Sequence, residues 1–468
     1  MFGESCLHIT DPLKVSGAYH DQEPNIFHIQ PQNLRYPHCQ EPYCGSLQVP
    51  GVIPLKVNFL TVAAHPLRSK LGALLYRRKT QKVLYDFDEF LLSHDTSGRA
   101  DPDKKALVSY LVGPLQPPPD KRDVSTFSNA GIAQYIPRAL NELGYSVDIV
   151  NYDNRKFVPS KKYDLFFGHG GINFEQIAKT MGPGCTKIYF STGIYWKEWN
   201  RVEKERLAAL GRRKGVVLPA DRFIEQDEES ANLTADGIIC LGNDHARSTY
   251  DKFPLVLNVN NAVFSDPSPY PVRNFSERRN NFLFFNGPGN VHKGLDLLLE
   301  AFSGLKQHLY VRQAIEPEFF KVYEKELTGR PNIHLLPFLK KPSHEFSSLM
   351  GSCAFVISPT CAEGQPGSVI ECMAHGLIPV LSREANIDTK EFGITLSENS
   401  VEEITSVVRA LSDKDDPWFR EKSAGVLEEV RQYYTPEHFL SAMKSAIGSG
   451  RAEPINSLTD RYPRSSSR

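Results

Sequence analysis

The chain has 468 residues, enough for two or three domains. Its hydrophobic content of 40% and charged content of 23% are ordinary for a globular protein in water, and a formal net charge of −1 gives no electrostatic basis for binding nucleic acid. No apolar run is long enough to span a bilayer, the first residues lack the pattern of a signal peptide, and the eight cysteines lie mostly in apolar segments. We therefore expect a cytoplasmic protein with free thiols.

The first part of the chain, residues 1–102, is rich in proline, histidine and polar residues and shows little periodicity. We expect an N-terminal extension of unclear fold. Four residues in it have side chains that could ligate zinc: His28, His38, Cys39 and Cys44. Their C-x4-C pair has no second pair at the spacing usual for zinc, so we expect no metal site.

Residues 103–270 alternate between short apolar runs and longer amphipathic stretches. This alternation predicts a Rossmann-like α/β domain with a parallel sheet, whose ligands bind at the carboxyl ends of the strands. The expected strands are 106–112, 145–150, 163–167, 187–190, 237–241 and 255–259. The expected helices are 132–143, one from 173, one from 196 toward 211, and one from 244 toward 251.

Two positions in this domain follow strands and are candidates for ligand contact. Gly131 ends a loop of small residues, where backbone could approach a phosphate. The alternative is an ordinary helix start with Ser128 or Asn129 as its N-cap. His169 lies in a glycine loop after the third strand and is a candidate on the acceptor side. Its alternative is a loop histidine held by a hydrogen bond.

A proline-rich segment, 266–279, is the expected linker to a second Rossmann-like domain, 271–447. The expected strands are 281–285, 309–311, 332–336, 355–358 and 378–381, and the expected helices are 295–302, 343–350, 367–375, 401–412 and 436–447. We expect the last helix to cross back to the first domain. Residues 448–468 are polar and form the expected tail.

The segment 355–380 carries the strongest chemical signal. A buried strand leads through a Gly- and Pro-rich loop into a short helix, whose first amides, at Gly367, Ser368 and Val369, suit a phosphate. Glu363 precedes this helix and Glu371 lies in it, and carboxylates accept hydrogen bonds from sugar hydroxyls. Together these features describe a nucleotide-sugar site.

Two other interpretations of this segment remain open. Ser368 to Glu371 also fits a capping box, in which Glu371 would only cap its own helix. Glu363 could be an ordinary loop carboxylate. The motif alone does not choose between these interpretations and the nucleotide-sugar site.

A second loop, 286–294, contains Gly287 and Lys293 between a strand and a helix. A lysine beside a glycine loop suits a diphosphate, because its compact charge sits on a flexible stem. We therefore count Gly287 and Lys293 among the donor-binding candidates.

The spacing of Glu363 and Glu371 resembles the E-x7-E signature of the retaining, two-domain (GT-B) glycosyltransferases of family 4. The resemblance implies that Glu363 meets the donor sugar, Glu371 the ribose and Lys293 the donor diphosphate. It covers about residues 105–447 and departs from the family at three places. The family's Arg before the lysine falls on Pro288, its Gly-Phe-Gly is Gly364-Gln365-Pro366, and its histidine after the next strand falls on Ser191 or Thr192. His292 or Arg279 could then assist Lys293.

The implied activity is transfer of a sugar, with retention of configuration, from a nucleotide-diphosphate sugar to an acceptor hydroxyl in glycan or polysaccharide biosynthesis. The resemblance makes Glu363, Lys293 and His169 the catalytic candidates and implies no metal and no cofactor besides the substrate. The acceptor would be a glycan, a lipid-linked molecule or a small molecule, and the basic run 212–214 suits peripheral contact with the inner face of a membrane. The alternatives are a nucleotide-sugar epimerase of the same fold, a catalytically silent sugar- or partner-binding module, and a scaffold acting through residues 1–100.

Overall fold

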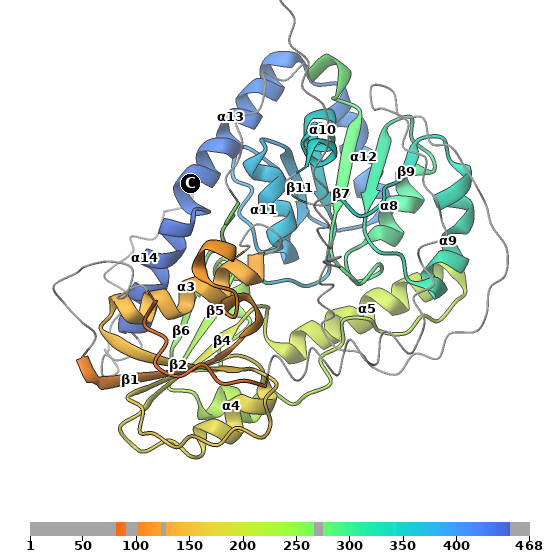
Figure 1. Ribbon diagram of the computed structural model, residues 1–468. Coiled ribbons are helices and arrows are strands. Elements are labelled where there is room, and N and C mark those ends of the chain that lie inside the picture. Colours follow the sequence, from red (N-terminus) through yellow and green to blue (C-terminus); the bar gives the residue numbers. More distant parts are fainter. Residues whose placement is uncertain are drawn as a thin grey trace, which may run out of the picture. The chain divides into compact units, whose positions relative to one another are not determined.

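The computed structural model describes residues 81–89, 101–122, 128–265, 275–339, 341 and 343–449 (Figure 1). All of them lie in one contact unit, Ala64–Arg468. Within the described residues the chain forms two sheets of six parallel strands. The predicted α/β fold class, with two Rossmann-like parallel sheets, is confirmed. The candidate zinc ligands His28, His38, Cys39 and Cys44 and the tail after residue 449 lie outside the described residues.

Each sheet, with the helices that cover it, forms one lobe of the protein. The sheet of the first lobe has the strand order β2-β1-β3-β4-β5-β6. Its strands carry apolar side chains on both faces, as expected for a parallel sheet covered by helices. The strands are β1 (Asp101–Tyr110), β2 (Tyr145–Asn151), β3 (Leu165–Gly168), β4 (Thr186–Ser191), β5 (Gly237–Leu241) and β6 (Val256–Val259). The helices are α3 (Ser128–Glu142), α4 (Gly171–Ala178), α5 (Trp196–Lys214), α6 (Glu229–Thr234) and α7 (Asp244–Ser248), with 3-10 turns η2 (Gly113–Leu115) and η3 (Pro119–Lys121).

The sheet of the second lobe has the order β12-β11-β10-β7-β8-β9. Its strands are β7 (Asn281–Phe285), β8 (His308–Arg312), β9 (Ile333–Leu335), β10 (Phe355–Ser358), β11 (Ile378–Ser382) and β12 (Ile394–Leu396). Its helices are α8 (Leu295–Phe302), α9 (Pro317–Gly329), α10 (His344–Ser352), α11 (Gly367–Ala374), α12 (Val401–Ser412) and α13 (Asp416–Tyr433), with 3-10 turns η4 (Phe275–Glu277) and η5 (Arg383–Ala385). Sequence periodicity predicted most of these elements but not β12, α9 or α13.

The two lobes exchange helices. The last helix, α14 (Pro436–Ser449), packs against α3 and places Phe439, Met443 and Ile447 in the core of the first lobe (Figure 1). In return, the C-terminal half of α5 places Leu210 in the core of the second lobe. Contacts therefore cross the sequence boundary predicted at residue 270, and the expected crossing of the last helix is confirmed.

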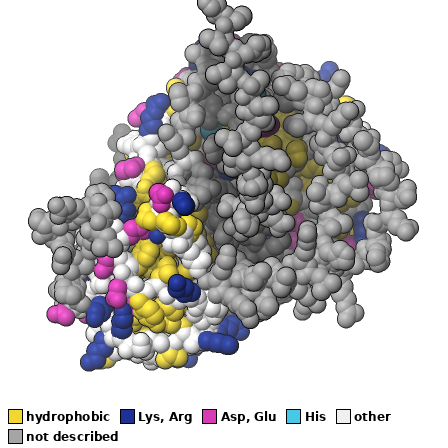
Figure 2. Space-filling view, in the orientation of Figure 1, with side chains coloured by type: hydrophobic (Ala, Val, Ile, Leu, Met, Phe, Trp, Pro, Cys, Tyr) yellow, Lys and Arg dark blue, Asp and Glu magenta, His cyan; other side chains and the backbone are white. Residues whose placement is uncertain are grey.

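On the described part of the face drawn in Figure 2, Lys and Arg side chains are interspersed with Asp and Glu around apolar groups, without a block of one sign. None of the helices in the described part of the chain combines the length and apolarity needed to cross a lipid bilayer. Five described cysteines are buried: Cys185, Cys240, Cys353, Cys361 and Cys372.

Candidate functional site

A cavity of 170 Å³ lies where the two lobes meet. The first lobe contributes Ser128 and residues 262–265, and the second contributes the carboxyl ends of β7 and β8 and the start of α11. The second-lobe residues that line it are Phe285, Asn286, Gly287, Arg312, Lys341, Gly367, Ser368 and Glu371. The sequence therefore predicted four of these residues as donor-binding: Gly287, Gly367, Ser368 and Glu371.

Two amides at the start of α11, in residues that line this cavity, have no hydrogen-bond partner within the described part of the chain. Its N-cap is Pro366, whose side chain has no hydrogen-bonding group, so no side chain caps the helix. The amide of Val369 donates to the Pro366 carbonyl at 3.0 Å, and the Val369 side chain is buried. Among the three predicted phosphate-binding amides, those of Gly367 and Ser368 thus remain for a ligand, at the positive end of the helix dipole.

Glu371 faces the cavity and not the start of its own helix. Its carboxylate forms an ion pair with Lys341, so the capping-box interpretation is wrong. Burial raises the pKa of Glu371, and the charges of Lys341 and Arg312 oppose that rise. A carboxylate held in this way keeps acceptor capacity for hydroxyl groups.

Arg312 is a cavity residue that sequence reasoning missed. It ends β8, and its guanidinium lies 5.2 Å from the ring centroid of Phe285 and 4.6 Å from that of Phe338. Burial lowers its pKa, and its Nε has no hydrogen-bond partner. The available signal was its position directly after a buried strand, at the sheet edge where ligands bind. Lys341, in the loop before α10, had no comparable signal.

Lys293 and Glu363 do not line this cavity, and they form an ion pair with each other. Lys293 is 6% exposed and Glu363 is 8% exposed. The hydroxyl of Thr360 donates to Glu363 Oε1 at 3.4 Å. Burial lowers the pKa of Lys293, and the positive charge of Arg222 lowers it further.

Neither cation predicted to assist Lys293 supplies a charge there. His292 is buried, with Nε2 2.7 Å from the carbonyl of Ala362, and burial lowers its pKa to about 4, so its imidazole is neutral at pH 7. Arg279 instead pairs with Asp416 at 2.5 Å, at the start of α13. The expectation of a helper role for either residue is wrong.

The loop that departs from the family pattern joins the lobes. Gln365 Oε1 accepts from the amide of Asn261 at 2.8 Å, and the Gln365 carbonyl accepts from the Asn261 side chain at 3.0 Å. Gln365 Nε2 donates to Asn260 Oδ1 and to the carbonyl of Asn386, both at 2.9 Å. Next to it, Gly364 packs directly on the carbonyl of Thr192. The lobes are therefore in contact beside Glu363.

The two first-lobe candidates have other surroundings. Gly131 lies in the first turn of α3, which begins at Ser128 and not at the predicted residue 132, and its α-carbon packs on the ring of Phe264, a cavity residue. His169 Nδ1 lies 2.9 Å from the carbonyl of Phe190, and burial lowers the pKa of the imidazole. Gly131 thus supports the cavity wall. His169 is held by a hydrogen bond, as its alternative interpretation as an ordinary loop histidine predicted.

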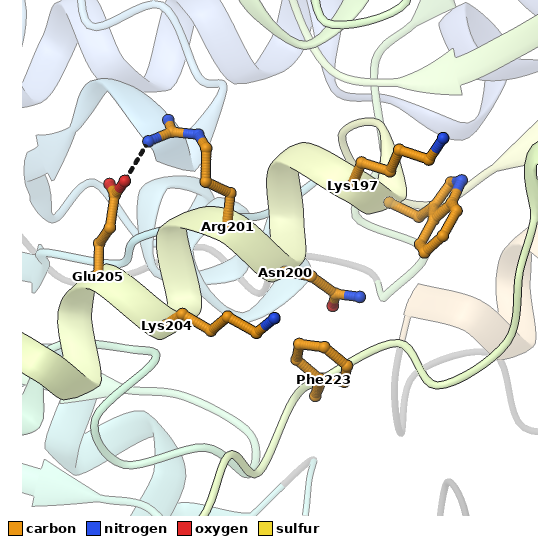
Figure 3. Close-up of a pocket in the computed structure, with 7 residues that line it drawn as sticks. Lys197, Asn200, Arg201, Lys204, Glu205 and Phe223 are labelled. Atoms are coloured by element: carbon orange, nitrogen blue, oxygen red, sulfur yellow. Dashed lines mark hydrogen bonds and ion pairs between the residues drawn. The ribbon is translucent and has the colours of Figure 1, made fainter.

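A second cavity, of 440 Å³, opens on the outer face of α5 (Figure 3). Lys204 points toward the ring of Phe223, with 5.0 Å from Nζ to the ring centroid, and Arg201 pairs with Glu205 at 2.5 Å. None of the predicted site residues lines this cavity.

The fold and the site at the lobe junction define a two-lobed GT-B protein. Residues 279–414 match the family model described as glycosyl transferases group 1, which covers the glycine loop, Lys293, Glu363 and Glu371. No curated protein matches the chain.

The chain is also similar to solved structures. A sucrose-phosphate synthase from Thermosynechococcus elongatus matches with a TM-score of 0.51 at 14% identity, over 74% of this chain and 98% of that one. HepE from Anabaena, in complex with UDP-glucose, matches with a TM-score of 0.47 at 12% identity, over 74% and 99%. TarM matches with a TM-score of 0.45 at 14% identity over 62% of this chain, which spans 55% of the TarM chain. The synthase supports the GT-B fold.

Proposed function

We propose that this protein is a retaining glycosyltransferase that moves a sugar from a nucleotide-diphosphate sugar to an acceptor hydroxyl. The observation that carries the proposal is the cavity that joins the free amides of Gly367 and Ser368 to the carboxylate of Glu371. An anion-binding helix end and a hydroxyl acceptor within one cavity are the two halves of a nucleoside-phosphate site. The match of residues 279–414 to the group 1 model supports the same function.

Each half of the donor then has a partner. Glu371 accepts hydrogen bonds from the ribose hydroxyls, and the amides at the start of α11 bind phosphate. Arg312 lines the cavity, and its planar guanidinium lies beside the rings of Phe285 and Phe338, so it is suited to stack on the base. The donor sugar extends toward Glu363, which exchanges its ion pair with Lys293 for sugar hydroxyls, while Lys293 turns to the diphosphate.

The chemistry that we propose needs positioning and charge stabilisation. The acceptor oxygen bonds to the anomeric carbon on the face that the diphosphate leaves, the carbon–oxygen bond to the diphosphate breaks, and a leaving-group phosphate oxygen takes the acceptor proton. Lys293 and the amides of α11 stabilise the charge that grows on the diphosphate. Since cationic side chains and dipoles can do this, we propose a metal-independent enzyme without a cofactor, and activity should survive EDTA.

The direct test is titration of the purified protein with UDP and GDP and with their glucose and mannose conjugates, followed by product analysis. We expect binding of at least one nucleotide, which raises the stability by about 2.7 kcal/mol at a hundredfold excess over Kd. We also expect free nucleoside diphosphate to form when an acceptor is added. Glu371→Gln should weaken binding of that nucleotide by about tenfold, because a charged hydrogen-bond acceptor is worth about 1.5–3 kcal/mol. Failure of every nucleotide to bind would reject the proposal.

Two rival functions give different results in the same assay. A nucleotide-sugar epimerase would return an isomerised nucleotide sugar without an acceptor. A catalytically silent binding module would bind nucleotide and release none, and the contact of Gly364 with Thr192, which closes the lobes beside Glu363, is the observation that favours it. We propose a glycan, lipid-linked or small-molecule acceptor, in glycan or polysaccharide synthesis in the cytoplasm or at the inner membrane face.

A further inference from the structure

The glycine loop 286–294 lacks a cation that its resemblance leads one to expect. Where the family pattern has arginine, the chain has Pro288, so Lys293 is the single basic side chain that the motif itself provides besides the neutral His292. A diphosphate carries at least two negative charges, and a loop with one lysine neutralises them poorly. A second cation from elsewhere in the fold would complete the site.

Arg222 lies on this loop although it comes from the segment between α5 and α6 of the first lobe. Its side chain packs on Gly289: a Cβ at that glycine would lie 2.6 Å from Arg222 Cγ and 3.0 Å from Cδ. Gly289 also has φ +97°, a backbone conformation that favours glycine. Both the close contact and the backbone conformation therefore restrict this position to glycine. The loop therefore has room for the arginine side chain where any other residue would collide with it.

The backbone of Arg222 is held on both sides. Its amide donates to Glu203 Oε1 at 2.8 Å, and its carbonyl accepts from the Trp199 indole at 2.7 Å. The guanidinium lies 5.9 Å from the ring centroid of Trp199, which itself stacks on His292 with 4.7 Å between centroids. The residue before Lys293 is thus packed against the same aromatic ring as Arg222.

The charge of this guanidinium has no direct counterion. Among the described residues no carboxylate forms an ion pair with it, and its Nε is buried without a hydrogen-bond partner. Three acids lie near enough to favour its charge without pairing with it: Asp221, Glu203, which accepts from the Arg222 amide, and Glu316, which accepts from the amides of Gly289 and Asn290 at 3.0 and 3.2 Å. Arg222 also lowers the pKa of Lys293, as like charges close together do. An anion between the two cations would relieve this repulsion.

The proposed donor site is within reach. Gly287 lines the cavity at the lobe junction, and Gly289 follows it by two residues, a span of at most about 7 Å. A ligand whose first phosphate lies at the start of α11 can therefore extend its second phosphate toward Gly289 and Lys293.

We propose that Arg222 binds the second phosphate of the nucleotide-diphosphate donor and replaces in space the arginine that the loop lacks in sequence. This inference rests on the proposed function. It makes Arg222 and Lys293 a pair of cations on opposite sides of the leaving group, one from each lobe's share of the chain. Charge on the departing diphosphate is then shared between them.

The test compares nucleotides with and without the second phosphate. Binding of UDP, UMP, GDP and GMP is measured by titration calorimetry for the wild type, Arg222→Gln and Arg222→Lys. The matched control is Arg201→Gln, which removes the same charge from the exposed face of α5, where Arg201 pairs with Glu198 and Glu205. Circular dichroism and thermal unfolding check that each variant folds.

We expect Arg222→Gln to weaken the binding of the diphosphate by about tenfold or more, and that of the monophosphate by less than about twofold, because an interaction with a charged group is worth about 1.5–3 kcal/mol. Arg222→Lys should lose less of the affinity for the diphosphate than Arg222→Gln does. Arg201→Gln should bind the diphosphate and the monophosphate as the wild type does. Equal losses for diphosphate and monophosphate, or no loss, would overturn the inference. If Arg222→Gln does not fold, Arg222→Lys is the deciding variant. The inference is overturned if the ratio of diphosphate to monophosphate affinity in Arg222→Lys equals that of the wild type. Absence of any binding by the wild type rejects the proposed function instead.

Discussion

The buried ion pair of Lys293 and Glu363 offers the sharpest test of the site as the structure shows it. The substitutions are Lys293→Met, which removes the ammonium and keeps an unbranched apolar stem, and Glu363→Gln, which keeps the shape of the carboxylate side chain. The side chains of Lys293 and Glu363 are 8% and 10% exposed, so water cannot solvate the charge that a single substitution leaves behind.

The expected magnitudes follow from this burial. Removing one member of a buried ion pair costs about 3–5 kcal/mol, because the other charge stays buried without a partner. Replacing both members removes the second penalty, so the double variant should lie within about 2 kcal/mol of the wild type. The coupling energy between the two sites is then at least about 4 kcal/mol, well above the 0.5 kcal/mol within which independent sites add.

The free energy of unfolding in urea, measured for all four proteins, gives this coupling energy. Tryptophan fluorescence is a suitable probe because Trp199 stacks on His292, the neighbour of Lys293, and its transition must coincide with that of circular dichroism. The reasoning is refuted if the losses of the two single variants simply add in the double variant. Such a result would mean that Lys293 and Glu363 do not interact in the folded protein.

Three further predictions concern the lobe junction, acid stability and the last helix. Gln365→Ala leaves the buried amide of Asn261 and the carbonyl of Asn386 unpaired, so the free energy of unfolding should fall by about 2–4 kcal/mol. The radius of gyration in X-ray scattering should rise, and an unchanged radius argues against lobes that are joined in solution. His292 has a pKa of 6.5 in the unfolded chain and about 4 in the folded protein, so lowering the pH from 7 to 5 should reduce the free energy of unfolding by about 2 kcal/mol. His292→Gln should weaken this pH dependence, and an equal pH dependence in the variant would contradict the role of His292. Deleting 436–468 removes Phe439 and its neighbours in α14 from the core of the first lobe, a loss of about 5–9 kcal/mol for three large side chains. The truncated chain should therefore lack a cooperative thermal transition. A transition like that of the wild type would contradict the packing of α14 in this core.

Local signals in the sequence predicted the regular elements well where the pattern is strong. The helix 295–302 and the helix 401–412 were predicted with the bounds that the structure has. The α11 segment was predicted to begin near Gly367, and its end near Gly376, where φ is +72°, follows from the preference of glycine for this conformation. Such features depend on residues within one or two turns of each other, so they can be predicted without knowing the fold.

The same reasoning was less successful for α3, which starts four residues before the predicted helix, and for α13, which was not predicted. α13 contains Pro417 in its first turn, a position that suits proline but lowers the helical signal. In both cases packing against other elements extends or stabilises a helix whose own residues give a weak pattern.

By itself, the sequence determined the α/β class, the parallel sheets and the placement of Gly287, Gly367, Ser368 and Glu371 at one sheet edge, because hydrophobic periodicity and glycine positions are local properties. Only the tertiary structure decided which charges meet: Lys293 with Glu363, Glu371 with Lys341, and Arg222 with the glycine loop. Side-chain pairing depends on contacts between residues far apart in the chain, such as the 104 positions that separate Asn261 from Gln365. The burial that sets the strength of each charge is likewise a property of the whole fold.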